Sequence, residues 1–310
     1  MARRLGLPHY TYTCTLSDAL AIVPQLPIIY DEPLGDSSAI PCVLLSQWAS
    51  KHVKVVLSAD GGDEVFGGYA RYVKACKTKD YLQKMPTALR LQLVERLLGR
   101  NFSPKVQKFI ACAASDLQLL SSMKIQSQYY HEILTQQTSQ AEAQRYLSNE
   151  PSASDPINAM LAWDYQHYLP HDIMAKVDRA CMYAGIEARE PLLDHRLVEL
   201  MASVQGNVKI RDGTTKYLFK KIVHQAMPAT MMQRPKKGFS IPLARWLGDK
   251  AFRTILHDNL HQTSLETSGL LDPKVCQQYL KDFLAGKTAY STAIWHILQF
   301  QLWYKHWIDR

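Results

Sequence analysis

The residues best suited to chemistry form a short acidic, glycine-rich run, Asp60-Gly-Gly-Asp-Glu64. Gly61 and Gly62 carry no Cβ atom, so their backbone N–H groups can come close to a bound ligand. A helix that begins near Asp63 would add the positive end of its dipole to the same concave turn. The run therefore predicts a small ligand site after a strand. The alternative is a tight, acid-capped turn between a strand and a helix.

The spacing of the glycines excludes one large class of nucleotide-binding loop. Gly62 and Gly67 stand as far apart as the two glycines of a Walker A loop, but Gly68 and Tyr69 occupy the positions of its lysine and its serine or threonine. The chain is therefore not a P-loop nucleotidase. In the simpler interpretation, Gly67 and Gly68 end a short helix that begins near Asp63.

The elements that must position this run are a strand before it and helices after it. Residues 53–58 are β-branched and nearly continuous, which predicts a strand buried on both faces of a parallel sheet. Open parallel sheets bind ligands at the carboxyl ends of their strands. In residues 10–15 aromatic and small polar residues alternate, which predicts a strand. In residues 17–26 the apolar residues recur at helical spacing, which predicts a helix. Beyond Asp80 helical patterns dominate, at residues 82–98, 106–120, 157–168, 173–183, 217–227 and 291–307.

Composition and charge narrow the class of protein. The 310 residues are 47% apolar and 21% charged, enough to bury a core, and this argues against disorder. No uncharged apolar run reaches the roughly 18 residues of a membrane span. The six cysteines form no C-x-x-C pair, so we expect reduced thiols and a cytoplasmic protein. The net charge of +8 is spread along the chain and does not indicate nucleic acid. The basic residues that would contact a phosphate backbone lack interleaved aromatics: Lys216, Lys220, Lys221, Arg234, Lys236 and Lys237.

Five motifs in a fixed order add a family resemblance to this pattern. They are Y-D-E-P-x-x-D-S-S at 30–38, L-S-x-D-G-G-D-E-x-F-G-G-Y at 57–69, D-x-x-x-K-x-D-R at 172–179, E-x-R-x-P-x-L-D at 187–194 and R-P-K-x-G-F-x-x-P at 234–242. With them the chain resembles the synthetase domain of glutamine-dependent asparagine synthetases, which belong to the ATP pyrophosphatase group. The resemblance covers essentially all 310 residues.

The resemblance implies a fold and a reaction. The fold is an α/β domain, residues 1–310, with the parallel sheet of an ATP-pyrophosphatase (adenine nucleotide alpha hydrolase-like) domain, truncated at its N-terminus. Residues 1–78 form part of the nucleotide-binding core, and residues 79–310 form a mainly helical lobe that completes the site. The reaction uses ATP and Mg²⁺ to adenylate the side-chain carboxylate of aspartate, or a related carboxylate, and ammonia then displaces AMP.

The resemblance also implies roles for individual residues. Lys236 matches a lysine that holds the α-phosphate, and Asp60 matches an acid that receives a proton from ammonia, where relatives often carry glutamate. Asp63 matches a magnesium ligand, and Asp172 matches an acid that receives the amino group of the substrate. The positions that match the ATP-binding loop are Ser58, Ala59, Gly61 and Gly62.

Several of these residues have structural interpretations as well. Asp172 equally fits a helix N-cap after Pro170. Acidic and polar residues of the first motif either flank a pocket or cap a helix: Asp31, Glu32, Asp36 and Ser37. The charged residues of the third and fourth motifs either line the site or form ion pairs between helices: Lys176, Asp178, Arg179, Glu187 and Arg189. Tryptophans of the last helix form either a docking stripe or core: Trp295, Trp303 and Trp307.

Two features expected from the resemblance are missing. No Ser-Gly-Gly occurs in the sequence, although the group carries a Ser-Gly-Gly-x-Asp-Ser loop for pyrophosphate. Residue 2 is alanine, whereas the glutaminase half uses an N-terminal cysteine as its nucleophile. We therefore expect ammonia to come from a separate glutaminase domain or partner chain. Three possibilities remain open: a split enzyme completed by another polypeptide, an amide ligase for a sugar or peptide carboxylate, and a non-catalytic remnant that binds a partner.

Overall fold

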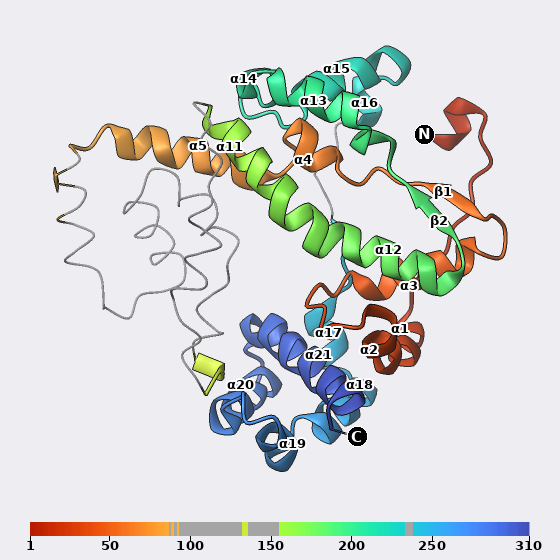
Figure 1. Ribbon diagram of the computed structural model, residues 1–310, viewed down its shortest axis with the longest axis vertical. Coiled ribbons are helices and arrows are strands. Elements are labelled where there is room, and N and C mark those ends of the chain that lie inside the picture. Colours follow the sequence, from red (N-terminus) through yellow and green to blue (C-terminus); the bar gives the residue numbers. More distant parts are fainter. Residues whose placement is uncertain (87, 90–91, 93–131, 136–154, 233–237, 310) are drawn as a thin grey trace.

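The computed structural model describes residues 1–86, 88–89, 92, 132–135, 155–232 and 238–309. The helix predicted at 106–120, most of that at 82–98, and Lys236 lie outside these residues. In Figure 1 one long helical segment crosses the middle of the molecule, with α13 to α16 on one side and α17 to α21 on the other.

The N-terminal part is helical, and the strand predicted at residues 10–15 is wrong. After η1 (Ala2–Leu5) the chain is irregular, and the side chain of Tyr10 is 72% exposed. No strand of the described residues lies beside it to pair with. Thr15 then begins α1 (Leu16–Ile22) with a capping box, in which Thr15 and Asp18 bond each other's backbone N–H. The helices that follow are η2 (Val23–Gln25), α2 (Leu26–Tyr30) and α3 (Ala39–Ala49).

The sheet has two parallel strands in the described part of the chain. β1 (Val55–Leu57) pairs with β2 (Glu187–Arg189), with Val55 opposite Glu187. A strand buried on both faces was the wrong prediction for β1, because Val55 is 42% and Leu57 74% exposed. Residues 55 and 57 point to one face of the strand, and no helix or strand of the described residues covers that face. The α/β class is confirmed by this sheet, whereas the larger sheet of an ATP pyrophosphatase stays a prediction.

The long helical segment consists of α11 (Pro156–Trp163), η3 (Asp164–Met174) and α12 (Ala175–Ala184). Its middle part, η3, is a π-helix that contains Pro170. Proline has no backbone N–H for the usual helical bond, and widening the turn accommodates this loss. The carboxylate of Asp155 caps the N-terminus of α11 by accepting from two backbone N–H groups. The helices predicted at 157–168 and 173–183 are therefore parts of one continuous segment (Figure 1).

Two groups of helices flank this segment. The first surrounds Val65, Phe66 and Met201 and is joined to β1 and β2. It consists of α4 (Gly62–Phe66), α5 (Ala70–Gln83), η4 (Pro191–Leu193), α13 (His195–Ser203), α14 (Gly206–Lys209), α15 (Tyr217–Ala226) and α16 (Ala229–Met232).

The second group surrounds the larger hydrophobic core together with α1, α2 and α3. It consists of α17 (Leu243–Leu247), α18 (Lys250–Asn259), α19 (Gln262–Thr267), α20 (Pro273–Leu284), η5 (Thr288–Tyr290) and α21 (Ser291–Trp307). Trp295 is fully buried, which bears out the core interpretation for this residue. Trp303 is half-buried and Trp307 is 38% exposed, and their indole N–H groups donate to the carbonyl oxygens of Asp31 and Pro27, which hold α21 against α2.

Two predictions drawn from composition can be compared with this fold. Cys42, Cys181 and Cys276 are buried free thiols, and Cys14 is a partly buried one. Among the described residues no helix has both the length and the apolar character needed to cross a membrane.

Candidate active site

The acidic glycine run forms the turn between β1 and α4. The backbone N–H of Ser58 donates to the carbonyl of Arg189 at 2.9 Å and so extends the pairing of β1 with β2 by one residue. The hydroxyl of Ser58 donates to the carboxylate of Asp60, whose own N–H lies 3.3 Å from that hydroxyl oxygen. Ala59 is exposed between them. The loop thus begins as predicted, at the carboxyl end of a parallel strand.

Close packing against neighbouring side chains requires glycine at both positions of the loop, Gly61 and Gly62. Gly61 has a φ of +78°, and a Cβ atom there would lie 2.1 Å from a methyl carbon of Leu193. A Cβ atom on Gly62 would lie 2.7 Å from a methyl carbon of Leu192. The space predicted for a ligand on that side of the glycines is therefore filled by the leucines of η4. The contact of Gly61 and Gly62 with ATP stays a prediction.

Asp63 is held by a lysine that sequence reasoning did not connect with it. The Lys216 ammonium lies 2.9 Å from Oδ1 of Asp63, and each side chain is about one quarter exposed. Gly68 makes room for this pair, since a Cβ atom there would lie 1.6 Å from the same carboxylate oxygen. Lys216 begins α15, and its backbone N–H donates to the carbonyl of Gly67. Lys216 stood out in the sequence only as one of several basic residues.

A third carboxylate lies beside the loop and was also missed. Burial, followed by the negative charges of Asp60 and Asp178, raises the pKa of Glu190. One of its carboxylate oxygens is buried without a hydrogen-bond partner in the described part of the chain. Strand alternation was the available signal, because Ala188 and Glu190 face the interior whereas Glu187 and Arg189 are exposed and pair with each other. The acidic pair Asp60 and Glu190 thus marks the carboxyl ends of both strands.

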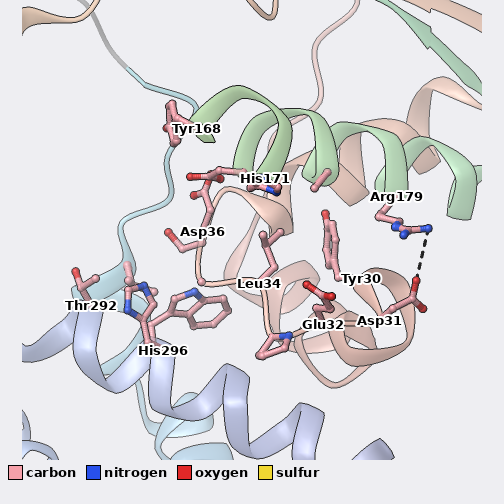
Figure 2. A pocket seen from close by; sticks show the side chains of 17 residues that line it. Tyr30, Asp31, Glu32, Leu34, Asp36, Tyr168, His171, Arg179, Thr292 and His296 are labelled. Atoms are coloured by element: carbon pink, nitrogen blue, oxygen red, sulfur yellow. Dashed lines mark ion pairs between the residues drawn. The ribbon is translucent and has the colours of Figure 1, made fainter. Parts of the chain in front are cut away.

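Asp172 lies at a separate and larger cavity of about 850 Å³. The cavity is enclosed by residues 30–37, by η3 with the start of α12, and by α21, from which Thr292 and His296 project (Figure 2). Because Asp172 lies inside the continuous helix η3, it is not a helix N-cap. The structural alternative for this residue is wrong. A carboxylate at a cavity is what the substrate-binding prediction requires.

Charged side chains of the first motif meet α12 at this cavity. Asp36 forms an ion pair with Lys176, and although burial opposes ionisation, the ammonium lowers the pKa of Asp36 below its usual value. Asp36 also accepts from the backbone N–H of Ser38 at 2.9 Å. Arg179 lies 3.6 Å from Asp31, the pair marked by a dashed line in Figure 2. The pocket interpretation of this motif holds, because its acids line the cavity, whereas the N-terminus of α3 at Ser38 has no side-chain cap.

The helix α12 lies between the two places. A further hollow of about 510 Å³ borders it, shares Ala175 with the large cavity and is lined also by Asp178 and Leu193. Leu193 is the residue that fills the space beside Gly61. Side chains of α12 therefore border both the large cavity and the surroundings of the turn after β1. Lys236 lies outside the described residues, so its approach to Asp63 stays a prediction.

Comparison with known proteins assigns the chain to a family. A family model described as asparagine synthase matches residues 1–305. The chain belongs to the asparagine synthase family. It is 27% identical over 321 residues to asparagine synthetase [glutamine-hydrolyzing] 1 of Bacillus subtilis, a match that covers 100% of the chain and 49% of that protein.

Other relatives give the same picture. A putative asparagine synthetase [glutamine-hydrolyzing] of Mycobacterium tuberculosis H37Rv is 27% identical over 331 residues, with 99% of the chain and 48% of that protein covered. A putative asparagine synthetase [glutamine-hydrolyzing] 2 of Methanocaldococcus jannaschii is 42% identical over 83 residues, or 27% of the chain and 16% of that protein. The chain thus spans about half the length of the relatives that match it throughout.

The described residues of this family member fit magnesium only together with a phosphate ligand. They contain no group of three or more acidic, histidine or cysteine side chains placed to hold a metal ion. Magnesium commonly takes one or two carboxylates and fills its other positions with phosphate and water oxygens. Asp63 supplies one partly exposed carboxylate in this way. Lys216 beside it adds positive charge where a phosphate would be held.

The packing of Gly61 can be tested by substitution. Gly61→Ala should lower the free energy of unfolding through both the positive φ and the clash with Leu193, by about 2–5 kcal/mol. Gly185→Ala is the matched control, since Gly185 has a φ of +66° and nothing within 4 Å, and should cost about 1–2 kcal/mol. Denaturant unfolding measures both. In a Leu193→Ala background, Gly61→Ala should lower the free energy of unfolding by less. An equal loss for Gly61→Ala and Gly185→Ala, or an undiminished loss in the Leu193→Ala background, would contradict the packing described.

The environment of Glu190 predicts a pH-dependent stability. Its raised pKa means that ionisation costs more in the folded than in the unfolded chain, so this residue lowers stability above an unfolded pKa of about 4.3. Glu190→Gln should raise the melting temperature near neutral pH, and the gain should vanish below about pH 4. Glu266→Gln, at an exposed helical site, should change little at either pH. A gain in melting temperature that does not depend on pH would show that ionisation of Glu190 does not destabilise the folded chain.

Proposed function

We propose that this chain is the synthetase part of an asparagine synthetase-type carbon–nitrogen ligase. In this proposal ATP activates the side-chain carboxylate of aspartate as an acyl-adenylate, and ammonia converts it to asparagine with release of AMP. The observation that supports it best is the match of the asparagine synthase model to residues 1–305. The placement of α12 agrees with it, because Asp178 of this helix acts on Glu190 beside the turn after β1, and Arg179 lines the cavity at Asp172.

The substrate would occupy the cavity at Asp172. The Asp172 carboxylate would receive the ammonium group of aspartate, a charge-assisted hydrogen bond stronger than a neutral one. Arg179 at the same cavity supplies a guanidinium suited to a substrate carboxylate, with Asp31 as its present partner. Lys176 is already neutralised by Asp36 and would hold the cavity wall rather than bind substrate.

ATP would lie at the turn after β1, against the predicted residues Ser58, Ala59, Gly61 and Gly62. An oxygen of the aspartate side chain would attack the α-phosphorus, and the bond from that phosphorus to pyrophosphate would break. Magnesium neutralises phosphate charge in such steps, and Asp63 would hold it. Lys216 would face the same phosphates, and Lys236 would stabilise the charge on the α-phosphate.

In the second step ammonia would attack the acyl carbon and AMP would leave. Asp60 would take the proton that the attacking nitrogen gives up. Ammonia would come from a glutaminase domain or partner chain, as the names of the glutamine-hydrolysing relatives suggest.

We further propose that the active assembly includes a polypeptide segment outside these 310 residues. The sequence contains no Ser-Gly-Gly for the pyrophosphate loop, and the apolar residues Val55 and Leu57 are exposed on β1. Parallel strands are normally covered on both faces. A segment that covers β1 and brings the missing loop would account for both observations. The alternatives to the proposed reaction are a ligase that acts on a different carboxylate and a chain that binds a partner without catalysis.

Reconstitution tests the proposed reaction. The chain is co-produced with the part of the Bacillus subtilis relative that it does not match, and given ATP, Mg²⁺, aspartate and ammonium. Aspartate-dependent AMP and asparagine should form, and Lys236→Ala should lower the rate by a factor of about 10² or more. Lys237→Ala, the adjacent lysine outside the motif, should retain the rate. Full turnover by Lys236→Ala would refute the assignment, and AMP formation with another carboxylate alone would favour a different substrate.

The role of Asp172 is tested in the same assay through its Michaelis constants. Asp172→Asn removes the charge that would hold the substrate ammonium, so the KM for aspartate should rise about ten- to a hundredfold. The KM for ATP should change little, because the proposal places ATP at the turn after β1 and not at the cavity of Asp172. Asp258→Asn, at an exposed position of α18, is the control. A parallel rise in both constants would indicate a structural role for Asp172.

A further inference from the structure

A third cavity, of about 260 Å³, lies apart from the large cavity at Asp172. It is lined by α4, α11, η3, α13 and α14, and it shares Tyr165 with the hollow of about 510 Å³. Its walls are largely apolar, with Leu161, Val198 and Met201 among them. Two ionisable side chains, Lys209 and Glu64, also line it. The proposed ligase reaction uses neither of them.

Lys209 is a buried cation without a matching anion in the described part of the chain. Lys209 is 3% exposed, and its ammonium donates to the amide oxygen of Asn158 at 2.7 Å. No carboxylate of the described residues lies within ion-pair distance of it. Asp155 is the nearest source of negative charge, but its two oxygens already accept from the backbone N–H groups of Ile157, Asn158 and Gly206. An ammonium carries three donors, so this one retains capacity for an anion.

The missing anion is costly for the folded protein. A buried charge is expensive unless it is paired, and a neutral amide offsets only part of that cost. Burial accordingly lowers the pKa of Lys209 to about 8. Because Lys209 lines the cavity, an anion placed there would reach it directly.

Glu64 restricts the charge of any molecule in the cavity. It is 2% exposed, accepts a hydrogen bond from the hydroxyl of Tyr69, and does not pair with Lys209. Burial raises its pKa, which shows that the surroundings disfavour negative charge at this end. A second anionic group would therefore be repelled, whereas an apolar chain would fit against Leu161, Val198 and Met201.

We infer that this cavity binds a small aliphatic monocarboxylate, with its carboxylate on Lys209 and its chain against the apolar wall. Isovalerate is a suitable probe, since it joins one carboxylate to a short branched apolar chain, and the cavity has a volume of about 260 Å³. The inference is independent of the proposed ligase reaction, because it involves other residues and no ATP.

Ligand-observed NMR with the full chain tests the inference. Isovalerate should bind saturably at concentrations below about 10 mM, and isovaleramide, which has the same shape without the charge, should bind about tenfold more weakly or not at all. Lys209→Met keeps the length of the side chain and removes the ammonium, and should weaken isovalerate by about tenfold or more. Lys250→Met, at an exposed lysine, should leave binding unchanged.

A second variant separates binding from folding. Ala162→Leu keeps Lys209 and fills part of the cavity, so it should also abolish isovalerate binding while circular dichroism reports an intact fold. The inference is overturned if Lys209→Met binds isovalerate as the unaltered chain does, if acetate binds as tightly as isovalerate, or if isovalerate fails to bind. Binding that survives Ala162→Leu in a folded variant would also place the ligand elsewhere.

Discussion

Parallel pairing of β1 with β2 is the constraint on which the rest of the site depends. The three residue pairs from Val55–Glu187 to Leu57–Arg189 join segments more than one hundred residues apart. Because the strands are parallel, both carboxyl ends lie at the same edge, and the chain that leaves each strand enters the same space. The turn with Gly61 therefore packs on the leucines that follow β2. Two acidic side chains, Asp60 and Glu190, are brought close enough for their charges to interact.

The helix α12 extends this constraint to the large cavity. Successive charged residues on it have different surroundings: Lys176 pairs with Asp36, Arg179 pairs with Asp31, and Asp178 lies near Glu190. The preceding π-helix, widened around Pro170, carries Asp172 to the cavity as part of the same segment. One helical segment thus extends from the large cavity to the neighbourhood of the acidic loop.

The exposed face of β1 and the family comparison point in the same direction. Two strands of three residues are a small sheet for an α/β domain, and one face of β1 is apolar yet open to solvent. The relatives that match the whole chain are about twice as long. A polypeptide that covers β1 would bury Val55 and Leu57, so the stability of this region and the completion of the proposed site would share one cause.

The sequence by itself determined the local features: the capping box of Thr15 and Asp18, the helix that begins beside Asp63, the final helix α21 at its predicted bounds, and the family motifs. These depend on hydrogen bonds and spacings within a few residues, which a sequence pattern displays. Tertiary structure alone decided that the strand face at Leu57 is open, that Lys216 pairs with Asp63, and that Lys209 lacks an anion in the described residues. Such contacts join distant segments, and their charges and burial depend on which elements pack together.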